Sequence, residues 1–314
     1  MKYIPIKLKN KKSKKKQAII THSNPKFKTK RLEKSINERL QHIYIPPNYK
    51  NLQIASSKHN KIQVIGEDNK NRKQYIYHPN HIKKIEHRKY HSLQELSDKI
   101  LIIEKDNHDY IKKLSHSTSS SLSKEDILQI IIYFLIYHQF RIGSLKYLQL
   151  YQSTGITTLK PKHFYLKPER IEIQFKGKKG ITNFSTIDPK SPFNIHKYMT
   201  KLLKKNLLKK RKDDFICHYY KLTPAGTLSK KPSLMTSKDV KDYFKEKYKL
   251  KITPKMFRTW YGNFYVFDFL CQSKPLYDAY MDAMKNKNDL VKDIKRERKQ
   301  LIKYVSTKLN NTET

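Results

Sequence analysis

The chain has 314 residues, of which 68 are Lys or Arg and 27 are Asp or Glu, so its formal net charge is +41. A chain of this length can bury a hydrophobic core without disulfides or a structural metal. Its two cysteines, Cys217 and Cys271, are far apart in the sequence, which is typical of free thiols in a reducing compartment, so we expect an intracellular protein. The longest apolar run, residues 130–137, is too short to cross a bilayer, and we expect no membrane-spanning helix.

The positive charge predicts a polyanionic partner. A chain this basic repels itself unless a polyanion neutralises it, and nucleic acid is the most common such partner. AT-rich codon usage is an alternative cause of the many Lys, Ile, Asn and Tyr residues, but it does not explain why acidic residues are scarce. We therefore expect nucleic-acid binding, with a membrane surface or another acidic partner as the alternatives.

Several chemistries have no motif in this sequence. The seven glycines form neither a P-loop nor a dinucleotide-binding loop, so we expect no ATP and no small-molecule cofactor. His78, His81, His87 and His91 lie close together, but they have no cysteine partners and stand in a basic stretch that repels cations. We expect them to be surface histidines rather than a zinc site.

The pattern along the chain predicts three segments. Residues 1–37 resemble a basic, disordered arm, because "KNKKSKKK" at residues 9–16 has no apolar period; a nuclear address and a nonspecific DNA-binding arm both fit it. Residues 38–90 are expected to form a small β-rich domain, in which "IQVIG" and "KQYIYH" predict a hairpin across a polar turn. Residues 91–314 are expected to form a mainly α-helical domain.

Two features stand out in the helical segment. Ser123 and Asp126 form a capping box before an apolar stripe that begins at Ile127. The stretches "RIEIQF", "KGKKG" and "ITNFSTI" predict a β-hairpin over residues 170–187. From Ile195 to Leu309 the pattern is mostly helical, with breaks at "LTPAG" and "SKPL". The predicted fold class is therefore α+β.

In a lysine-rich protein, a cation is informative where solvent is not expected. Arg141 stands between two apolar runs, and Arg258 lies within "KMFRTWYGNFYVFDFL". A buried guanidinium is costly unless an anion satisfies it, either an internal carboxylate or a bound phosphate. The scarcity of acidic residues favours the phosphate. Two such arginines, together with a lysine from the hairpin turn, are suited to phosphoryl transfer without a metal.

Four stretches of the sequence resemble the small type IB DNA topoisomerases of poxviruses and other large DNA viruses. In the order and spacing of that family, they are "IGEDNKNRKQYIYH", "FRIGSLKYL" followed by "TGITTLKPKHF", "IEIQFKGKKG" and "ITPKMFRTWYG". The resemblance covers about residue 40 to the C-terminus. It implies a small β-rich N-terminal domain, followed by a mostly helical catalytic domain of the tyrosine-recombinase and topoisomerase IB kind that carries a β-hairpin.

The resemblance also implies roles for particular residues. Arg141 and Arg258 would clamp the scissile phosphate. Lys178 would reach the minor groove and act with Lys255 to deliver a proton to the 5′ oxygen, with the neighbouring Lys176 and Lys179 as alternatives to Lys178. The implied DNA contacts are Lys70, Arg72, Gln74, Tyr75 and Tyr77 in the major groove, and Tyr147 elsewhere. Tyrosine recombinases usually carry His three positions before their second arginine, so Lys255 at that position favours the topoisomerase.

In this family a tyrosine hydroxyl attacks a phosphodiester to form a 3′-phosphotyrosyl bond, without ATP or metal. The tyrosine normally follows a signature of the form Leu-Gly-(His or Asn)-Thr-Pro. The stretch "LNNTET" of this sequence resembles the beginning of that signature. Asn311 would take the His/Asn place, but Glu313 replaces the proline and the nucleophile falls beyond residue 314. Tyr277, Tyr280 and Tyr304 precede the signature and fit it poorly.

We therefore expect either a fragment of such an enzyme or a member without a nucleophile, which binds DNA without cleaving it. A catalytically silent DNA-binding protein with the same fold and a tyrosine recombinase remain the alternatives. The expected partner is double-stranded DNA, clamped by a monomer, with no membrane and no metal. A viral factory, a virion and a nucleus are equally compatible with the sequence.

Overall fold

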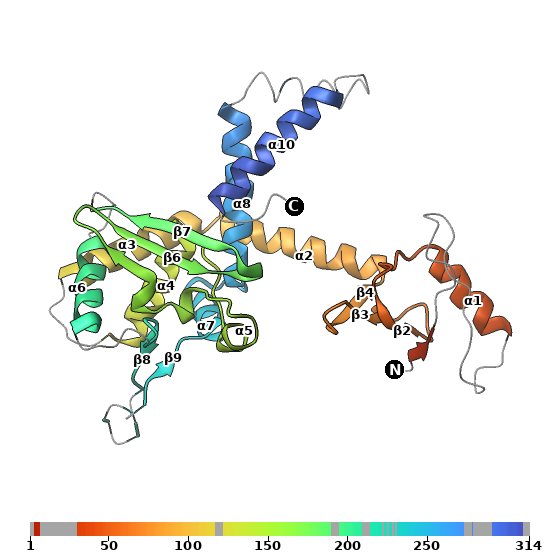
Figure 1. Cartoon of the computed structure of the whole chain (residues 1–314), viewed down its shortest axis with the longest axis horizontal. Helices are drawn as coiled ribbons and strands as arrows, with labels where there is room; N and C mark the ends of the chain where they lie inside the picture. The colour runs from red at the N-terminus through yellow and green to blue at the C-terminus, as the bar shows by residue number, and fades with distance from the viewer. Residues whose placement is uncertain are drawn as a thin grey trace. The chain divides into compact units, whose positions relative to one another are not determined.

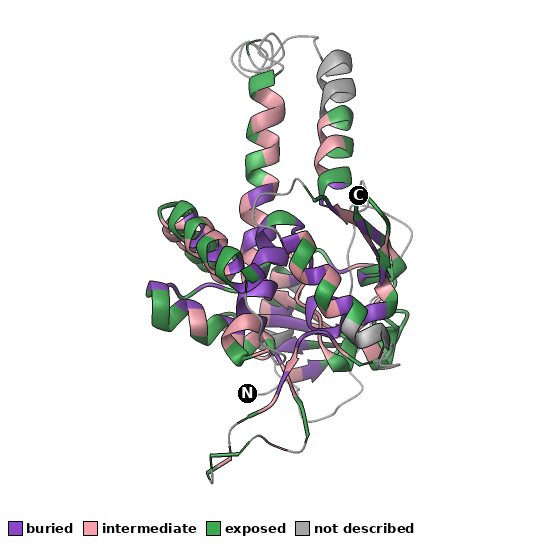
Figure 2. Ribbon diagram, turned by 90° about the vertical axis from the view of Figure 1, so that its left-hand side faces the viewer, coloured by how far each residue is buried: buried purple, intermediate pink, exposed green. Residues whose placement is uncertain are grey.

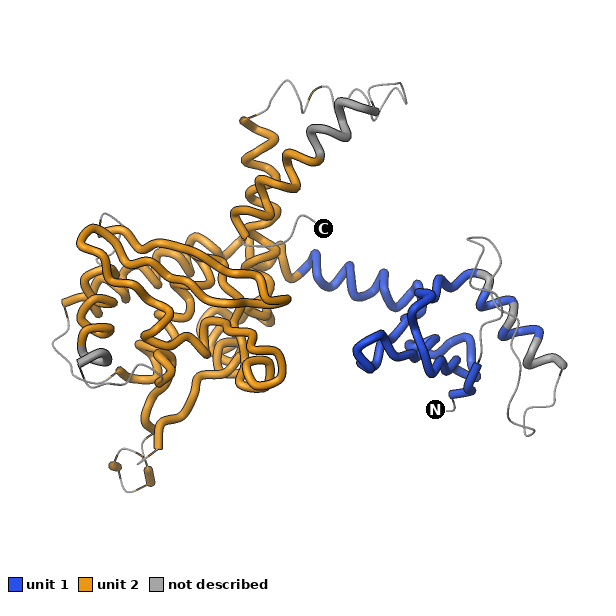
Figure 3. The backbone as a smooth tube through the Cα atoms, viewed as in Figure 1, with its two compact units in different colours: residues 1–91 blue, residues 92–314 orange. Residues whose placement is uncertain are grey.

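The computed structural model describes residues 3–6, 30–116, 122–189, 195–208, 214–272 except 222, 225, 228 and 230, residue 278, and 291–309. The chain divides into two compact units, residues 1–91 and residues 92–314 (Figure 3). This division falls one residue after the domain boundary predicted from the sequence. Each unit has a hydrophobic core of its own.

The described elements are helices and short antiparallel strands, which come in groups along the chain (Figure 1). The helices are α1 (Lys30–Gln41), α2 (Pro79–Ser97), α3 (Ile100–His116), α4 (Lys124–Tyr137), α5 (Leu145–Tyr151), α6 (Ile195–Leu208), α7 (Ser237–Tyr248), α8 (Pro254–Gln272) and α10 (Val291–Lys308). The 3₁₀ turns are η1 (Ile156–Thr158), η2 (Pro161–His163) and η3 (Lys178–Gly180). The strands are β1 (Tyr3–Pro5), β2 (Lys50–Ala55), β3 (Ile62–Glu67), β4 (Lys73–Tyr77), β5 (Phe164–Leu166), β6 (Ile171–Lys176), β7 (Thr182–Ile187), β8 (His218–Tyr219) and β9 (Ser233–Leu234). The predicted α+β class is confirmed.

Unit 1 contains a four-stranded antiparallel sheet in the order β1-β2-β3-β4. The predicted hairpin is β3 and β4, in which Ile65 pairs with Tyr75 and Gly66 with Gln74. A Cβ on Gly66 would lie 2.8 Å from Cδ2 of the buried Leu52. The Gly66–Gln74 pair therefore lies where β3 packs closely against the Leu52 side chain of β2. The core face therefore includes Gly66 and Gln74, and the opposite face carries Tyr75.

The prediction of a disordered arm over residues 1–37 is wrong at two places. Residues 3–5 form β1, which pairs with β2, and Ile4 and Ile6 are buried in the core of unit 1. The alternation of these apolar residues fits a strand with one buried face, a signal that the neighbouring lysine run obscured. Helix α1 begins at Lys30 and buries Ile36 and Leu40 at helical spacing. Residues 7–29, which include the lysine run, lie outside the described residues.

Unit 2 is built around α4, which is buried along nearly its whole length. The predicted capping box starts this helix: the Ser123 Oγ accepts from the Asp126 amide at 3.1 Å, and the Asp126 carboxylate accepts from the Ser123 amide at 2.7 Å. Next to it, β5, β6 and β7 form an antiparallel sheet, in which β6 and β7 are the predicted hairpin. The small sheet of β8 and β9 was not predicted, because its strands are too short to show a period.

The helices that follow pack against this core. The Tyr261 hydroxyl of α8 donates to Glu104 of α3 at 2.6 Å, and the Lys99 ammonium donates to the Tyr248 carbonyl of α7 at 2.6 Å. Helices α8 and α10 run side by side (Figure 1). Burial on α8 is concentrated at its N-terminal end, where Phe257 and Arg258 enter the core (Figure 2). In the described part of the chain, no helix is both long and apolar enough to span a membrane.

Candidate phosphate-binding site

Among the predicted site residues that the structure describes, Arg258 is the most buried, with 7% of its surface exposed. It stands in the first turns of α8, and its guanidinium donates hydrogen bonds to the backbone carbonyls of Gln139 and Leu309, the latter at 2.6 Å. Burial first, and then the positive charge of Arg141, lower the pKa of Arg258 to about 9. An arginine keeps its proton at neutral pH, so a buried, charged guanidinium in this place would be stabilised by a bound anion.

Gln139 organises the same region from the end of α4. It has a left-handed φ of 47°, which turns the chain so that its carbonyl faces Arg258. Its side-chain oxygen accepts a hydrogen bond from the Tyr265 hydroxyl at 3.1 Å. Sequence analysis missed Gln139, because a polar residue in an apolar run gives no signal of what it contacts.

Arg141 follows two residues later, in a loop whose path is fixed by two glycines. Gly143 has a φ of +80°, a conformation that favours glycine. A Cβ on Gly155 would lie 2.5 Å from the Gly143 nitrogen and 2.6 Å from the Arg141 carbonyl oxygen. The Arg141 carbonyl also accepts from the Ile156 amide at 2.9 Å. Direct contact between two backbones therefore positions Arg141, which is half-buried.

The hairpin turn between β6 and β7 brings Lys178 to the same place. The Gly177 amide donates to the Ile181 carbonyl at 2.8 Å, and the Asn183 side-chain amide, which is buried, donates to the same carbonyl at 3.1 Å. A Cβ on Gly177 would collide with the Asn183 amide. The Thr154 amide binds the Lys176 carbonyl at 2.8 Å, which connects the turn to the Arg141 loop.

Four cations from three parts of unit 2 thus come together. Lys178 has its pKa lowered by burial and then by the charges of Arg141, Lys255 and Lys179. Lys255 is exposed in the first turn of α8, three residues before Arg258 and therefore on the same side of the helix. We call Arg141, Lys178, Lys255 and Arg258 the cation cluster. Like charges gathered in this way repel one another until an anion binds between them.

Two tyrosines near the C-terminal helices have hydroxyls that donate hydrogen bonds within the protein. The Tyr304 hydroxyl of α10 donates to Asp268 at 2.9 Å, and this bond raises the pKa of Tyr304. Asp268 follows Arg258 by ten residues on α8, which is about 15 Å along a helix. Tyr265 lies closer, bound to Gln139. Asn311, Tyr277 and Tyr280 lie outside the described residues.

The predicted DNA contacts fall in both units. Tyr147 belongs to unit 2, where it is 56% exposed on α5 and stacks on Tyr151 at 6.0 Å between ring centroids. The other five predicted contacts belong to the β3–β4 hairpin of unit 1: Lys70, Arg72, Gln74, Tyr75 and Tyr77. Tyr75 and Tyr77 share one face of β4, and Gln74 lies on the other.

Asp68, which sequence analysis did not single out, organises the hairpin turn. One carboxylate oxygen accepts from the amides of Lys70 and Arg72, at 2.9 and 3.0 Å. The other accepts from the Arg72 Nε at 2.8 Å and from the Gln74 Nε2 at 2.9 Å. The Arg72 guanidinium, with these amides, holds the pKa of the Asp68 carboxyl well below its usual range. Two of the predicted DNA contacts are therefore held in place by one carboxylate.

Replacing Asp68 with Asn is expected to lower the melting temperature at neutral pH. A carboxyl whose pKa is depressed by folding stabilises the folded state above its unfolded pKa of about 3.9, and this contribution is lost as the pH falls through the folded value. The difference between wild type and D68N should therefore shrink from pH 7 toward pH 3 in thermal denaturation followed by circular dichroism. An unchanged difference at pH 3 would show that the charge of Asp68 is not what stabilises the turn.

Comparison with known proteins assigns the family. The profile of the eukaryotic DNA topoisomerase I catalytic core matches residues 69–314, more than three quarters of the chain. The chain belongs to this family. The matched region contains the whole cation cluster and the β4 strand, so the type IB topoisomerase resemblance seen in the sequence is confirmed.

The relatives that match the chain include DNA topoisomerases of large DNA viruses. The DNA topoisomerase 1B of Acanthamoeba polyphaga mimivirus is 27% identical over 257 residues, which cover 82% of this chain and 70% of that protein. The DNA topoisomerase I of Monkeypox virus is 27% identical over 155 residues, and the DNA topoisomerase 1B of Vaccinia virus (strain Copenhagen) is 26% identical over 155 residues. Each of these two matches spans 46% of this chain and 46% of the poxvirus protein.

Proposed function

We propose that this chain binds double-stranded DNA as a monomer and holds one phosphodiester in the cation cluster, for the relaxation of supercoiled DNA. The observation that carries the proposal is that the cation cluster gathers Arg141 from a loop, Lys178 from a hairpin turn, and Lys255 and Arg258 from α8, close enough for their charges to interact. Cations on three separate elements are gathered where a single divalent or monovalent anion would relieve their repulsion. A DNA phosphate is such an anion, and the net charge of +41 favours DNA over smaller partners.

The proposed reaction exchanges one phosphoester bond for another. A tyrosine oxygen attacks the phosphorus, the bond from phosphorus to the 5′ oxygen breaks, and a 3′-phosphotyrosyl bond forms. Arg141 and Arg258 neutralise the nonbridging oxygens as negative charge grows on them. Lys178, with Lys255, gives a proton to the departing 5′ oxygen, a transfer that a lowered lysine pKa makes easier. After the free strand rotates, the 5′ hydroxyl attacks the phosphorus and restores the DNA.

DNA binding without cleavage is the second candidate function. It is favoured by the contacts of Tyr265 and Tyr304, whose hydroxyls donate to Gln139 and Asp268. A hydroxyl bound in this way has to leave its partner before it can attack a phosphate. In this case the cation cluster serves as a phosphate-binding site alone.

A plasmid assay separates the two candidates. Supercoiled plasmid is incubated with the purified chain in EDTA without ATP, and topoisomers are resolved on agarose. In parallel, a 5′-labelled duplex is quenched with SDS to detect transfer of label to protein. Relaxation with transfer is the expected result for the enzyme, and retention of the duplex in a gel shift without either is the result for binding alone. Failure to bind the duplex at 100 mM salt would contradict both. Sedimentation velocity tests whether one copy binds.

A further inference from the structure

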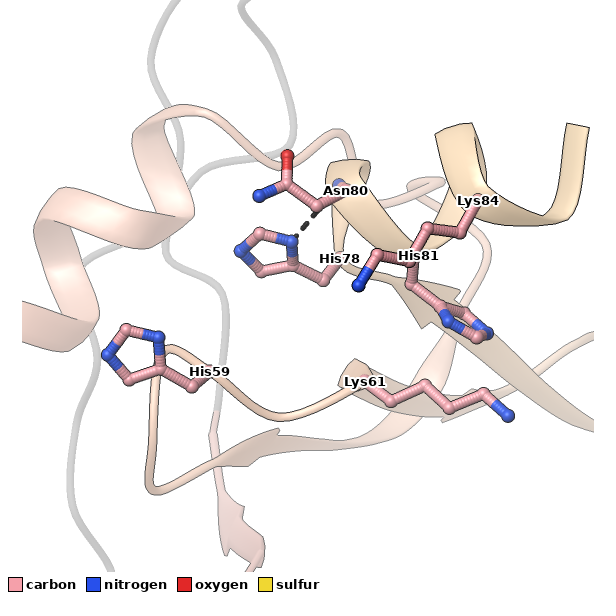
Figure 4. A pocket seen from close by; sticks show the side chains of 6 residues that line it. All are labelled: His59, Lys61, His78, Asn80, His81 and Lys84. Carbon is pink, nitrogen blue, oxygen red and sulfur yellow. Dashed lines mark hydrogen bonds between the residues drawn. The ribbon is translucent and has the colours of Figure 1, made fainter. Parts of the chain in front are cut away.

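Unit 1 contains a pocket that plays no part in the proposed reaction. Its volume is about 240 Å³ (Figure 4). The residues that line it come from the connection between β2 and β3, from the end of β4 and from the first turns of α2: His59, Lys61, His78, Asn80, His81 and Lys84. Of the four histidines predicted to lie on the surface, His78 and His81 line this pocket with intermediate exposure, and His87 and His91 are exposed.

The charges around this pocket suit an anion. The lining side chains include two lysines and three histidines, and none is acidic. Burial first, then the charges of Lys61, Arg88 and Lys84, lower the pKa of His81. A metal ion would meet the same repulsion, and within the described ranges no group of three or more His, Cys, Asp or Glu side chains is placed to hold one.

His78 has the geometry of a hydrogen-bond donor to such an anion. Its Nδ1 accepts a hydrogen bond from the Asn80 amide at 3.1 Å (Figure 4). The His78 carbonyl accepts from the His81 amide at 2.8 Å. Because Nδ1 is an acceptor, the proton of the neutral ring is on Nε2, which can donate to an anion. His78 thereby caps the N-terminus of α2, whose dipole adds a further preference for negative charge.

We propose that this pocket binds a phosphate group, and that in the DNA complex the group is a backbone phosphate beside the groove that β4 contacts. The assignment of this group to a DNA phosphate rests on the proposed function. His78 follows Tyr77 directly, so the pocket lies about 10 Å from Tyr75 at the strand spacing of about 3.3 Å per residue. A phosphate here would fix the register of the hairpin on DNA, since phosphate contacts position a protein and base contacts read sequence.

The pocket makes binding depend on pH. The groups that face His81 include Tyr77 of β4, whose ring centroid lies 5.5 Å from that of His81, Lys61 from the connection between β2 and β3, and Lys84 and Arg88 of α2. His59 and His78 line the same pocket. A bound phosphate stabilises protonated imidazole, so complex formation takes up protons and affinity rises as the pH falls from 8 to 6. One proton taken up corresponds to about a tenfold gain in affinity per pH unit at most.

Two probes test the proposal on the full chain. Inorganic phosphate and a 20-base-pair duplex are titrated separately at pH 6 and pH 8 and at constant ionic strength, with chloride as the reference anion. The imidazole signals are followed by two-dimensional NMR with each probe, and fluorescence anisotropy also gives the Kd for the duplex. Shifts at His59, His78 and His81 with both probes indicate a site open to free phosphate. Shifts with the duplex alone indicate a site for the DNA backbone, and no shift with either overturns the proposal.

The matched variants are H59Q/H81Q in the pocket and H87Q/H91Q on the exposed part of α2. H59Q/H81Q should lose the gain in duplex affinity between pH 8 and pH 6, and H87Q/H91Q should keep it. K61Q/K84Q, which leaves the histidines in place, should weaken binding at both pH values by about threefold to tenfold. An equal pH response in the two histidine variants would overturn the proposal. If the plasmid assay fails while phosphate still shifts the pocket histidines, the proposed function falls and the pocket stands.

Discussion

Replacing Arg258 with Met is expected to abolish plasmid relaxation, or to weaken duplex binding if the chain does not cleave, and to destabilise unit 2. Loss of one donor to the developing negative charge costs about 10²–10³ in rate in comparable sites. The substitution also leaves the buried carbonyls of Gln139 and Leu309 without this partner, at about 1–3 kcal/mol for each unsatisfied group. Relaxation rate and thermal denaturation measure the two effects.

Two further variants separate charge from geometry in this experiment. R258K keeps a positive charge but cannot bridge two carbonyls as a planar guanidinium does, so it should restore less than half of the lost stability. R170M is the matched control, because Arg170 is exposed and pairs with Glu172 at 2.7 Å on the sheet surface. If R258M relaxed plasmid at the wild-type rate, the assignment of Arg258 to the phosphate would be wrong.

Replacing Gly155 with Ala is expected to displace Arg141 without touching any charged group. The new Cβ would meet the backbone of Gly143 and Arg141 at 2.5–2.6 Å, and backbone cannot move aside as a flexible side chain can. Overpacking of this kind costs about 1–3 kcal/mol. A shift of 1 Å in a catalytic group is enough to cost about 10²-fold in rate. G155A should therefore lose relaxation activity, or duplex affinity if the chain does not cleave, while remaining folded.

Gly262 provides the control for this substitution. It lies within α8, and a Cβ there meets Cδ1 of Leu309 at 3.4 Å, an ordinary contact. G262A should be neutral or stabilise the protein by about 0.5–1 kcal/mol, since Ala favours helix over Gly. Equal activity in G155A and wild type would mean that the contact between the two loops does not position Arg141.

Much of the fold was readable in the sequence because its signals are local. The capping box of Ser123 and Asp126 and the Gly-bounded turn around Lys178 each depend on residues a few positions apart. The same holds for the β3–β4 hairpin. The β1 strand was missed because three residues next to a lysine run carry too little pattern, and its stability comes from pairing with β2, some 50 residues away.

The candidate site, too, was predictable from the sequence only where its signals are local. By itself the sequence determined which cations stand in apolar surroundings and that they follow the order of a type IB topoisomerase. Tertiary structure alone decided that Arg258 is held by the carbonyls of Gln139 and Leu309, that Gly155 supports Arg141, and that His59 joins His78 and His81 in one pocket. These contacts join residues far apart in the chain through backbone atoms and through packing. Because backbone atoms are the same at every residue type, the identity of a residue does not reveal such a contact.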